Sequence, residues 1–125
     1  MRSATTDPDE PGSETALYAA MELLGQRWVL RVVWELEPGP LGFLELRRRM
    51  GNCSSSMLAE RLATLTQVGI LEKHPDKSYS LTPHRGATLG EALEPLWQWA
   101  DKHSDTLTKA TRTRPDAGQN ARKRG

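Results

Sequence analysis

The feature that most constrains the fold is a leucine-striped segment that follows a turn and runs directly into a hairpin signal. Its apolar residues recur at helical spacing, at Leu58, Leu62 and Leu65. Ser54 can cap the start of this helix with its hydroxyl, and Gly69 is a natural stop. Residues 70–74 and 78–81 then have the composition of two short strands joined by turn residues. A helix followed at once by a hairpin is typical of a winged helix-turn-helix.

Helical spacing of apolar residues also predicts the structure of the rest of the middle of the chain. The expected helices lie near residues 17–24, 27–37, 42–50 and 83–100. Gly51-Asn52 forms the turn before the leucine-striped helix, and Pro95 is expected to kink or divide the last helix. The predicted class is therefore mainly α with a small β-hairpin wing (α+β).

Charge is distributed unevenly along the chain. The 17 Lys and Arg residues nearly balance the 16 Asp and Glu residues, which leaves a net charge of +1. This balance hides a net charge of −3 over residues 1–14, −1 over residues 15–106 and +5 over residues 107–125. Both ends are poor in large apolar residues and cannot bury enough surface to offset chain entropy. We therefore expect a disordered acidic tail over 1–14, a folded domain over 15–106 and a disordered basic tail over 107–125.

Simple patterns exclude several classes of protein. The single cysteine, Cys53, rules out an internal disulfide framework and fits a reducing cytoplasm. No apolar run reaches the roughly 18 residues that a membrane span needs, and the first residues lack the apolar core of a secretory signal. The histidines and Cys53 show no metal-ligand spacing, and neither a nucleophile elbow nor a glycine-rich phosphate loop occurs. We expect a cytoplasmic protein that is not an enzyme, holds no metal or cofactor and does not bind a membrane.

Four ordered segments carry a family resemblance. The first two segments are Leu23-Leu24-Gly25-Gln26-Arg27-Trp28 and Phe43-x-x-Leu46. The third runs from Ser54 through Arg61-Leu62 to Gly69-Ile70-Leu71. The fourth is Tyr79-x-Leu81-Thr82-x-x-x-Gly86-x-x-Leu89, and it ends at Trp99. Together they resemble HxlR-type transcriptional regulators over residues 15–104. The resemblance implies a homodimer, formed through the first and last helices, that binds DNA with its recognition helix and its wing. Many members carry a cysteine ahead of the first helix, where this chain has Thr15.

The leucine-striped helix supplies the first set of candidate DNA contacts. The candidates are Ser54, Ser55, Ser56, Glu60, Arg61 and Thr64. Hydroxyls in the first turn of a helix suit a phosphate, because backbone amides point out there. Glu60 is either an acceptor for a cytosine amino group or a solvated charge, and Arg61 lies toward the edge of the buried stripe. The centre of the outer face carries no Lys or Arg, so bidentate contacts to guanine are not expected from this helix.

The flanks supply the positive charge. The candidates there are Arg47, Arg48 and Arg49 before the turn, and Lys73, His74 and Lys77 in the wing. The three arginines are either a solubilising face or phosphate contacts, and the neighbouring helix-turn-helix favours phosphate contacts. The wing residues are candidates for the small groove or the DNA backbone. The basic tail either adds salt-sensitive attraction to DNA or acts only as a solubility extension.

The last helix is apolar around too much of its circumference to face only solvent. The candidate dimer-interface residues are Leu17, Ala20, Met21, Leu89, Leu93, Leu96, Trp97 and Ala100. Trp34 and Trp97 are candidates for the interface or for a small effector pocket, with the interface favoured. Trp28 and Trp99 are expected in the core.

These observations predict a homodimeric winged-helix transcription factor that binds a two-fold operator in double-stranded DNA and represses by blocking polymerase. A small-molecule effector of unidentified chemistry is left open as a further partner. The alternative is a winged-helix protein-interaction module with little or no specific DNA binding. The donor-poor recognition helix and the short wing motivate this alternative.

Overall fold

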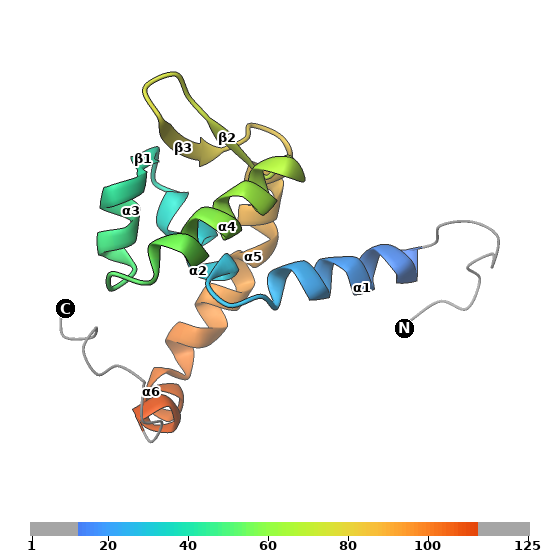
Figure 1. The fold of residues 1–125 in the computed structure, drawn as a ribbon. Helices are drawn as coiled ribbons and strands as arrows, with labels where there is room; N and C mark the ends of the chain where they lie inside the picture. The colour runs from blue at the N-terminus through green and yellow to red at the C-terminus, as the bar shows by residue number, and fades with distance from the viewer. Residues whose placement is uncertain (1–12, 113–125) are drawn as a thin grey trace. The chain divides into compact units, whose positions relative to one another are not determined.

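A computed structural model describes residues 13–112 of the chain (Figure 1). The chain divides into two units, residues 1–30 and residues 31–125, and each is described by itself. In the first unit, helix α1 (Ser13–Leu24) ends where the Gly25 amide donates to the carbonyl of Met21 at 2.9 Å. Trp28 then takes a φ of 76°, a left-handed conformation that lets the chain turn into helix α2 (Val29–Leu36).

The second unit contains most of α2 and all of the remaining helices and strands (Figure 1). In chain order these are β1 (Leu41–Gly42), α3 (Phe43–Arg49), α4 (Ser55–Gln67), β2 (Leu71–Lys73), β3 (Ser78–Leu81), α5 (Arg85–Lys102) and α6 (Ser104–Arg112). The strands form an antiparallel sheet in the order β1-β3-β2, in which Tyr79 pairs with both Leu41 and Lys73. The predicted class, mainly α with a small antiparallel wing, is confirmed.

The core of this unit is built from the apolar faces of its helices. Its fully buried side chains include Val32, Val33, Leu36, Leu46, Leu58, Leu62, Leu65 and Leu71. The leucine stripe of α4 therefore lies inward as its spacing predicts, and Ser54 caps this helix by accepting from the Met57 amide at 3.2 Å. Because the stripe and the cap fix both the rotation and the start of α4, the opposite face of the helix is left outside.

The junction between the wing and α5 brings backbone directly against backbone. The Thr82 hydroxyl donates to the carbonyl of Gly69 at 2.7 Å and accepts from the Gly86 amide at 2.8 Å. A Cβ atom on Gly86 would come closer to the Ile70 carbonyl oxygen than real side chains come, and would lie 2.9 Å from Cβ of Leu81. This position is therefore restricted to glycine, which explains the Thr82-x-x-x-Gly86 spacing.

Four features differ from the sequence-based expectation. Helix α5 is one helix from Arg85 to Lys102, so the division that was one of the two expected effects of Pro95 does not occur. Strand β1, of only two residues, was not expected, because a run that short carries no periodicity. Helix α6 includes residues 107–112, where a disordered tail was expected to begin. Trp99, expected in the core, is 52% exposed.

The expected tails lie largely outside the described residues, which exclude 1–12 and 113–125. Over residues 13–112, no helix is both long and apolar enough to cross a bilayer.

Replacing Gly86 by Ala should lower the free energy of unfolding by about 1–3 kcal/mol, because the added methyl group overpacks a site where only backbone fits. Urea denaturation measures this change. Gly39→Ala is the matched control, because a Cβ there meets nothing within 4 Å. Equal stabilities of the two variants would contradict this account of the junction.

Candidate nucleic-acid interface

The turn between α3 and α4 is made by two consecutive left-handed residues. Gly51 has a φ of 76° and Asn52 a φ of 57°, and their amides donate to the carbonyls of Arg48 and Arg47 at 3.1 and 2.9 Å. Glycine and asparagine are the residues that tolerate this conformation best. The turn follows the end of α3 at Arg49 and leads to Ser54, which caps α4. The local sequence therefore sets the geometry of the two helices.

The outer face of α4 is polar and open at its N-terminal end. Ser54, Ser55 and Ser56 are exposed, and the hydroxyls of Ser54 and Ser56 lie 3.2 Å apart. Glu60 is also exposed, whereas Thr64 is half-buried. The sequence-based placement of these residues on the outer face is correct for all but Thr64, which is only partly available.

Arg61 lies mostly inside the protein surface. Its side chain is 17% exposed, and its Nη1 atom lies 3.6 Å from Oε1 of Glu60, whose side chain is 72% exposed. The helix therefore offers hydroxyls and a carboxylate to a partner, with its one arginine held to the side.

Arg47 differs from its two neighbours in the cluster. Its Nε atom donates to the carbonyl of Cys53 at 2.6 Å, and the side chain is half-buried. This bond ties the end of α3 to the residue that precedes the α4 cap. Arg47 therefore stabilises the turn and is less available to a partner than Arg48 and Arg49, which are exposed.

Arg48 and Arg49 converge on one carboxylate, that of Glu45. Arg48 approaches it with Nε at 3.1 Å and Nη2 at 2.5 Å, and Arg49 approaches with Nε at 2.8 Å. Hydrogen bonds from Arg48, then from Arg49, lower the pKa of Glu45 from its ordinary value of 4.5 to about 2. Two cations thus share one anion, and the group keeps a net positive charge on an exposed helix.

Arg31 adds a long-range contact at the same end of α3. Its Nη2 atom donates to the carbonyl of Arg49 at 2.6 Å, while its Nε atom donates to Glu35 at 2.7 Å. Arg31 therefore connects α2 to α3. The roles of Glu45 and Arg31 were not expected from the sequence. Only that of Glu45 has a local signal, namely its spacing of three and four residues from Arg48 and Arg49.

Hydrogen bonds within the wing hold its hairpin in one shape. The Asp76 carboxylate accepts from the Ser78 amide at 2.9 Å and from the Ser78 hydroxyl at 2.7 Å, and both bonds lower the pKa of Asp76. Lys77 has a φ of 72° at the exposed tip. The turn predicted at residues 75–77 is therefore built by an aspartate that bonds the backbone two residues on.

Two of the three wing candidates have contacts within the hairpin. Nε2 of His74 lies 2.7 Å from the Ser80 hydroxyl. Nζ of Lys73 lies 5.6 Å from the centre of the Tyr79 ring, in a cation–π arrangement. Lys77 is exposed in the turn that joins β2 to β3. The three candidates thus lie within one hairpin.

Arg85 is a further basic residue beside this surface that sequence reasoning did not single out. Its Nη1 atom donates to the Val68 carbonyl at 2.8 Å, and the guanidinium lies against the backbone of Gly69. Gly69 has a φ of 84°, which turns the chain away from α4. Because glycine has no Cβ, the Arg85 guanidinium can lie against it. Arg85 therefore fastens the end of α4 to the start of α5.

The candidate dimer residues differ in their exposure. Leu17, Ala20 and Met21 are exposed on α1, in the first unit. On α5, Leu93 is buried, Leu89, Trp97 and Ala100 are half-buried, and Leu96 is exposed. The rings of Trp97 and Trp34 meet edge to face at 5.2 Å, while Trp34 is 48% exposed. Leu93 therefore belongs to the core of its own unit, and Trp34, Leu96 and Trp99 leave apolar surface uncovered.

The single cysteine, Cys53, lies inside the protein. Cys53 is buried, and this burial raises the pKa of its thiol. Among residues 13–112, no three His, Cys, Asp or Glu side chains come together as a metal site.

Comparison with known proteins identifies similar chains. Residues 23–108 match a family model described as HxlR-like helix-turn-helix. The HTH-type transcriptional regulator YodB of Bacillus subtilis is 33% identical over 89 residues, which cover 67% of this chain and 80% of that protein. The uncharacterised HTH-type transcriptional regulator YtfH of Escherichia coli is 35% identical over 81 residues, which cover 60% and 64% of the two chains.

Solved structures of transcriptional regulators are also similar to this chain. The structure of quinone-bound YodB from Bacillus subtilis has a TM-score of 0.63 and 34% identity, and it covers 70% of this chain and 96% of its own. A possible HxlR family transcriptional factor from Thermoplasma volcanium has a TM-score of 0.64 at 24% identity, with 84% and 95% covered. The second match shows likeness of fold alone.

The Glu45 carboxylate should titrate near pH 2, well below its ordinary value, because protonation breaks its bonds to the two arginines. A pKa lowered by folding stabilises the protein above the unfolded value of 4.5, and this contribution is lost as the pH falls toward 2. Carboxyl-detected NMR titration measures the midpoint. Arg48→Gln should raise it and Lys77→Gln should leave it unchanged, whereas a wild-type midpoint near 4.5 would contradict the arrangement.

Proposed function

The chain belongs to the HxlR-like helix-turn-helix family of DNA-binding transcriptional regulators, and we propose that it acts as a homodimeric repressor on a two-fold operator. The observation that carries the proposal is the open N-terminal half of α4. Helix α4 begins after the Gly51-Asn52 turn. In the sequence, Arg48 and Arg49 precede the helix and the wing follows it. A recognition helix presents this part of its surface to base edges in the major groove.

The contacts fall into two groups. Ser55, Ser56 and Glu60 face the bases, where hydroxyls accept or donate and the carboxylate accepts from a cytosine amino group. Arg48 and Arg49 contact phosphates, and Glu45 holds their guanidinium groups before DNA arrives. Lys77 reaches the DNA backbone or small groove from the wing tip, with Lys73 and His74 behind it. Phosphate contacts position the protein and the few base contacts select the sequence.

Dimerisation is supported by uncovered apolar surface. Leu96 and Trp99 on α5 and Trp34 on α2 are all more than a third exposed. On α1, Leu17 and Met21 are exposed as well. Burying such side chains against a second copy stabilises the dimer by the removal of apolar area from water. A dimer places two α4 helices on one operator, and a repressor that occupies it blocks polymerase.

The chemistry of the cysteine distinguishes this chain within the family. The Bacillus relative YodB has a structure with bound quinone. Here Thr15, which lies in the first turns of α1, stands where the resemblance expects a cysteine, and the single cysteine is buried with a raised thiol pKa. We therefore do not assign a sensing role to Cys53.

A second candidate function is a protein-interaction module. It is favoured by one observation, which is that the centre of the exposed α4 face carries no Lys or Arg and that Arg61 is held to the side by burial. Titration of labelled duplex DNA at several salt concentrations separates the two functions. Absence of binding at low salt by the folded chain would contradict the regulator and favour the module.

Arg48→Glu should weaken DNA binding across all sequences and lower the slope of log affinity against log salt by about 1, because one phosphate contact is lost. Fluorescence anisotropy measures both quantities. Lys102→Glu, at the exposed end of α5, is the matched charge reversal and should leave the affinity unchanged. Unchanged binding by Arg48→Glu would remove the arginines from the contact surface.

The wild-type chain should sediment as a dimer at micromolar concentration, and Leu96→Glu should shift it toward monomer because a carboxylate would be buried in the interface. Leu44→Glu is the control, since Leu44 is exposed on α3 outside the proposed interface. A monomeric wild type, or equal dimerisation of the two variants, would contradict the role given to α5.

A further inference from the structure

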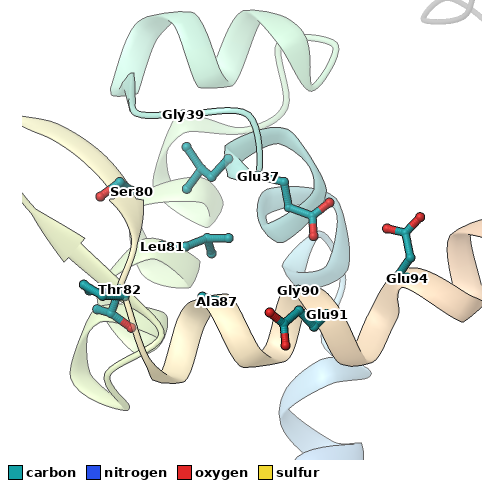
Figure 2. A pocket seen from close by; sticks show the side chains of 11 residues that line it. Glu37, Gly39, Ser80, Leu81, Thr82, Ala87, Gly90, Glu91 and Glu94 are labelled. Carbon is teal, nitrogen blue, oxygen red and sulfur yellow. The ribbon is translucent and has the colours of Figure 1, made fainter.

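A cavity of about 630 Å³ lies beside the wing and is separate from the candidate DNA contacts. Its walls come from the end of α2 and the following loop, from β3, and from α5 (Figure 2). Leu36, Leu81 and Ala87 give it an apolar part, and Glu37, Glu91 and Glu94 give it carboxylates. All of these residues belong to the second unit of the chain.

Two glycines line this space. Gly39 lies in the loop after α2, and Gly90 lies on the face of α5 that lines the cavity. The Glu37 carboxylate lies directly over Gly90, since a Cβ there would be 2.6 Å from Oε2 of Glu37. Figure 2 shows Glu37 extending from the end of α2 and Glu94 extending from α5 toward the same space. Glu94 also accepts a bond from Gln98 at 3.3 Å.

The charge of the cavity has one sign. Of the described residues that line it, three are glutamates and none is lysine, arginine or histidine. No ion pair within residues 13–112 involves these three carboxylates. Anions gathered around a partly apolar cavity repel one another and favour a cation among them.

The spacing of the carboxylates selects the kind of cation. Among residues 13–112, no three acidic, histidine or cysteine side chains are arranged to hold a metal ion, so these glutamates do not converge on one point. An organic cation suits this arrangement better than a metal ion does. Its positive charge is spread over several atoms that can face separate carboxylates, and its apolar part can pack against the apolar wall of the cavity. Cavities of about 300–1,000 Å³ hold ligands of this size.

We propose that this cavity is a binding site for a small organic cation, an ammonium or amidinium group carried on a compact apolar body. The cationic group lies among Glu37, Glu91 and Glu94, and the body packs on Leu36, Leu81 and Ala87. Binding removes apolar surface from water and offsets the repulsion among the carboxylates.

The location of the cavity gives the cation a route to the wing. Ser80 lines the cavity, and its hydroxyl also lies 2.7 Å from Nε2 of His74, a candidate DNA contact. A cation that shifts Ser80 therefore acts on the wing through one hydrogen bond. Any difference in cation affinity between the free and DNA-bound protein changes DNA affinity by the same factor. This regulatory role rests on the proposed function, whereas cation binding itself does not.

The test is isothermal titration calorimetry of the full chain, without DNA, using benzamidinium and its uncharged analogue benzamide. Benzamidinium should bind, and benzamide, of nearly the same shape, should bind at least about fivefold more weakly, because the carboxylates attract only the charged probe. Equal binding of the two probes, or no binding of benzamidinium at millimolar concentration, overturns the proposal. This comparison uses the unaltered protein and does not depend on any variant folding.

Single substitutions then locate the site. Glu37→Gln and Glu91→Gln should each weaken benzamidinium binding about fivefold, because each removes one charge at nearly constant shape. Glu72→Gln, on β2 outside the cavity, is the matched control and should not change the affinity. Unchanged affinity in both cavity variants overturns the assignment to this cavity, as does an equal loss in the control.

Occupation of the site by the chain's own C-terminal cations is the alternative that a further variant tests. Replacing Arg122, Lys123 and Arg124 by Gln in the full chain should leave benzamidinium affinity unchanged. A rise in affinity would show that the chain's own cations occupy the site, and it would overturn the proposal of a small molecule. A chain that binds benzamidinium but no DNA would leave the site standing and contradict only the proposed function.

Discussion

The Thr82 hydroxyl makes the contact on which the arrangement of the second unit depends. It bonds the carbonyl of Gly69, where α4 ends, and the amide of Gly86, where α5 begins. Since β2 and β3 lie between these two residues in sequence, one hydroxyl closes the wing onto both helices. The close approach of Gly86 to Ile70 makes the joint rigid, because no side chain intervenes. Thr82 also lines the acidic cavity, so the same joint shapes the proposed cation site.

The candidate interface obtains its positive charge through organised contacts within the protein. Glu45 holds Arg48 and Arg49, Arg47 is used to close the turn, and Arg31 bonds the carbonyl of Arg49. Three consecutive arginines therefore have different roles. Only those held by Glu45 remain available to phosphates, and their guanidinium groups need less ordering when DNA binds, because the helix already fixes them.

The sequence predicts those features that depend on neighbours close in the chain. The leucine stripe, the Ser54 cap and the Gly51-Asn52 turn locate α4, and the wing follows from its strand composition and turn residues. Features set by distant residues were not predictable, because no local pattern encodes them. The bond from Arg31 to the carbonyl of Arg49, the pairing of β1 with β3 and the exposure of Trp99 are of this kind. Helix α5 is not broken at Pro95, although a break is one of the two effects that a proline inside a helix is expected to have.

Within the second unit, charged side chains of opposite sign lie in separate groups. Cations lie on α3 and at the wing tip, whereas three carboxylates surround the cavity between the end of α2, β3 and α5. Strand β3 belongs to both regions, since its Ser80 contacts His74 on one hand and lines the cavity on the other. Neutralising the carboxylates with a bound cation makes the potential at the wing more positive. On this argument, charge alone favours tighter DNA binding in the presence of the cation.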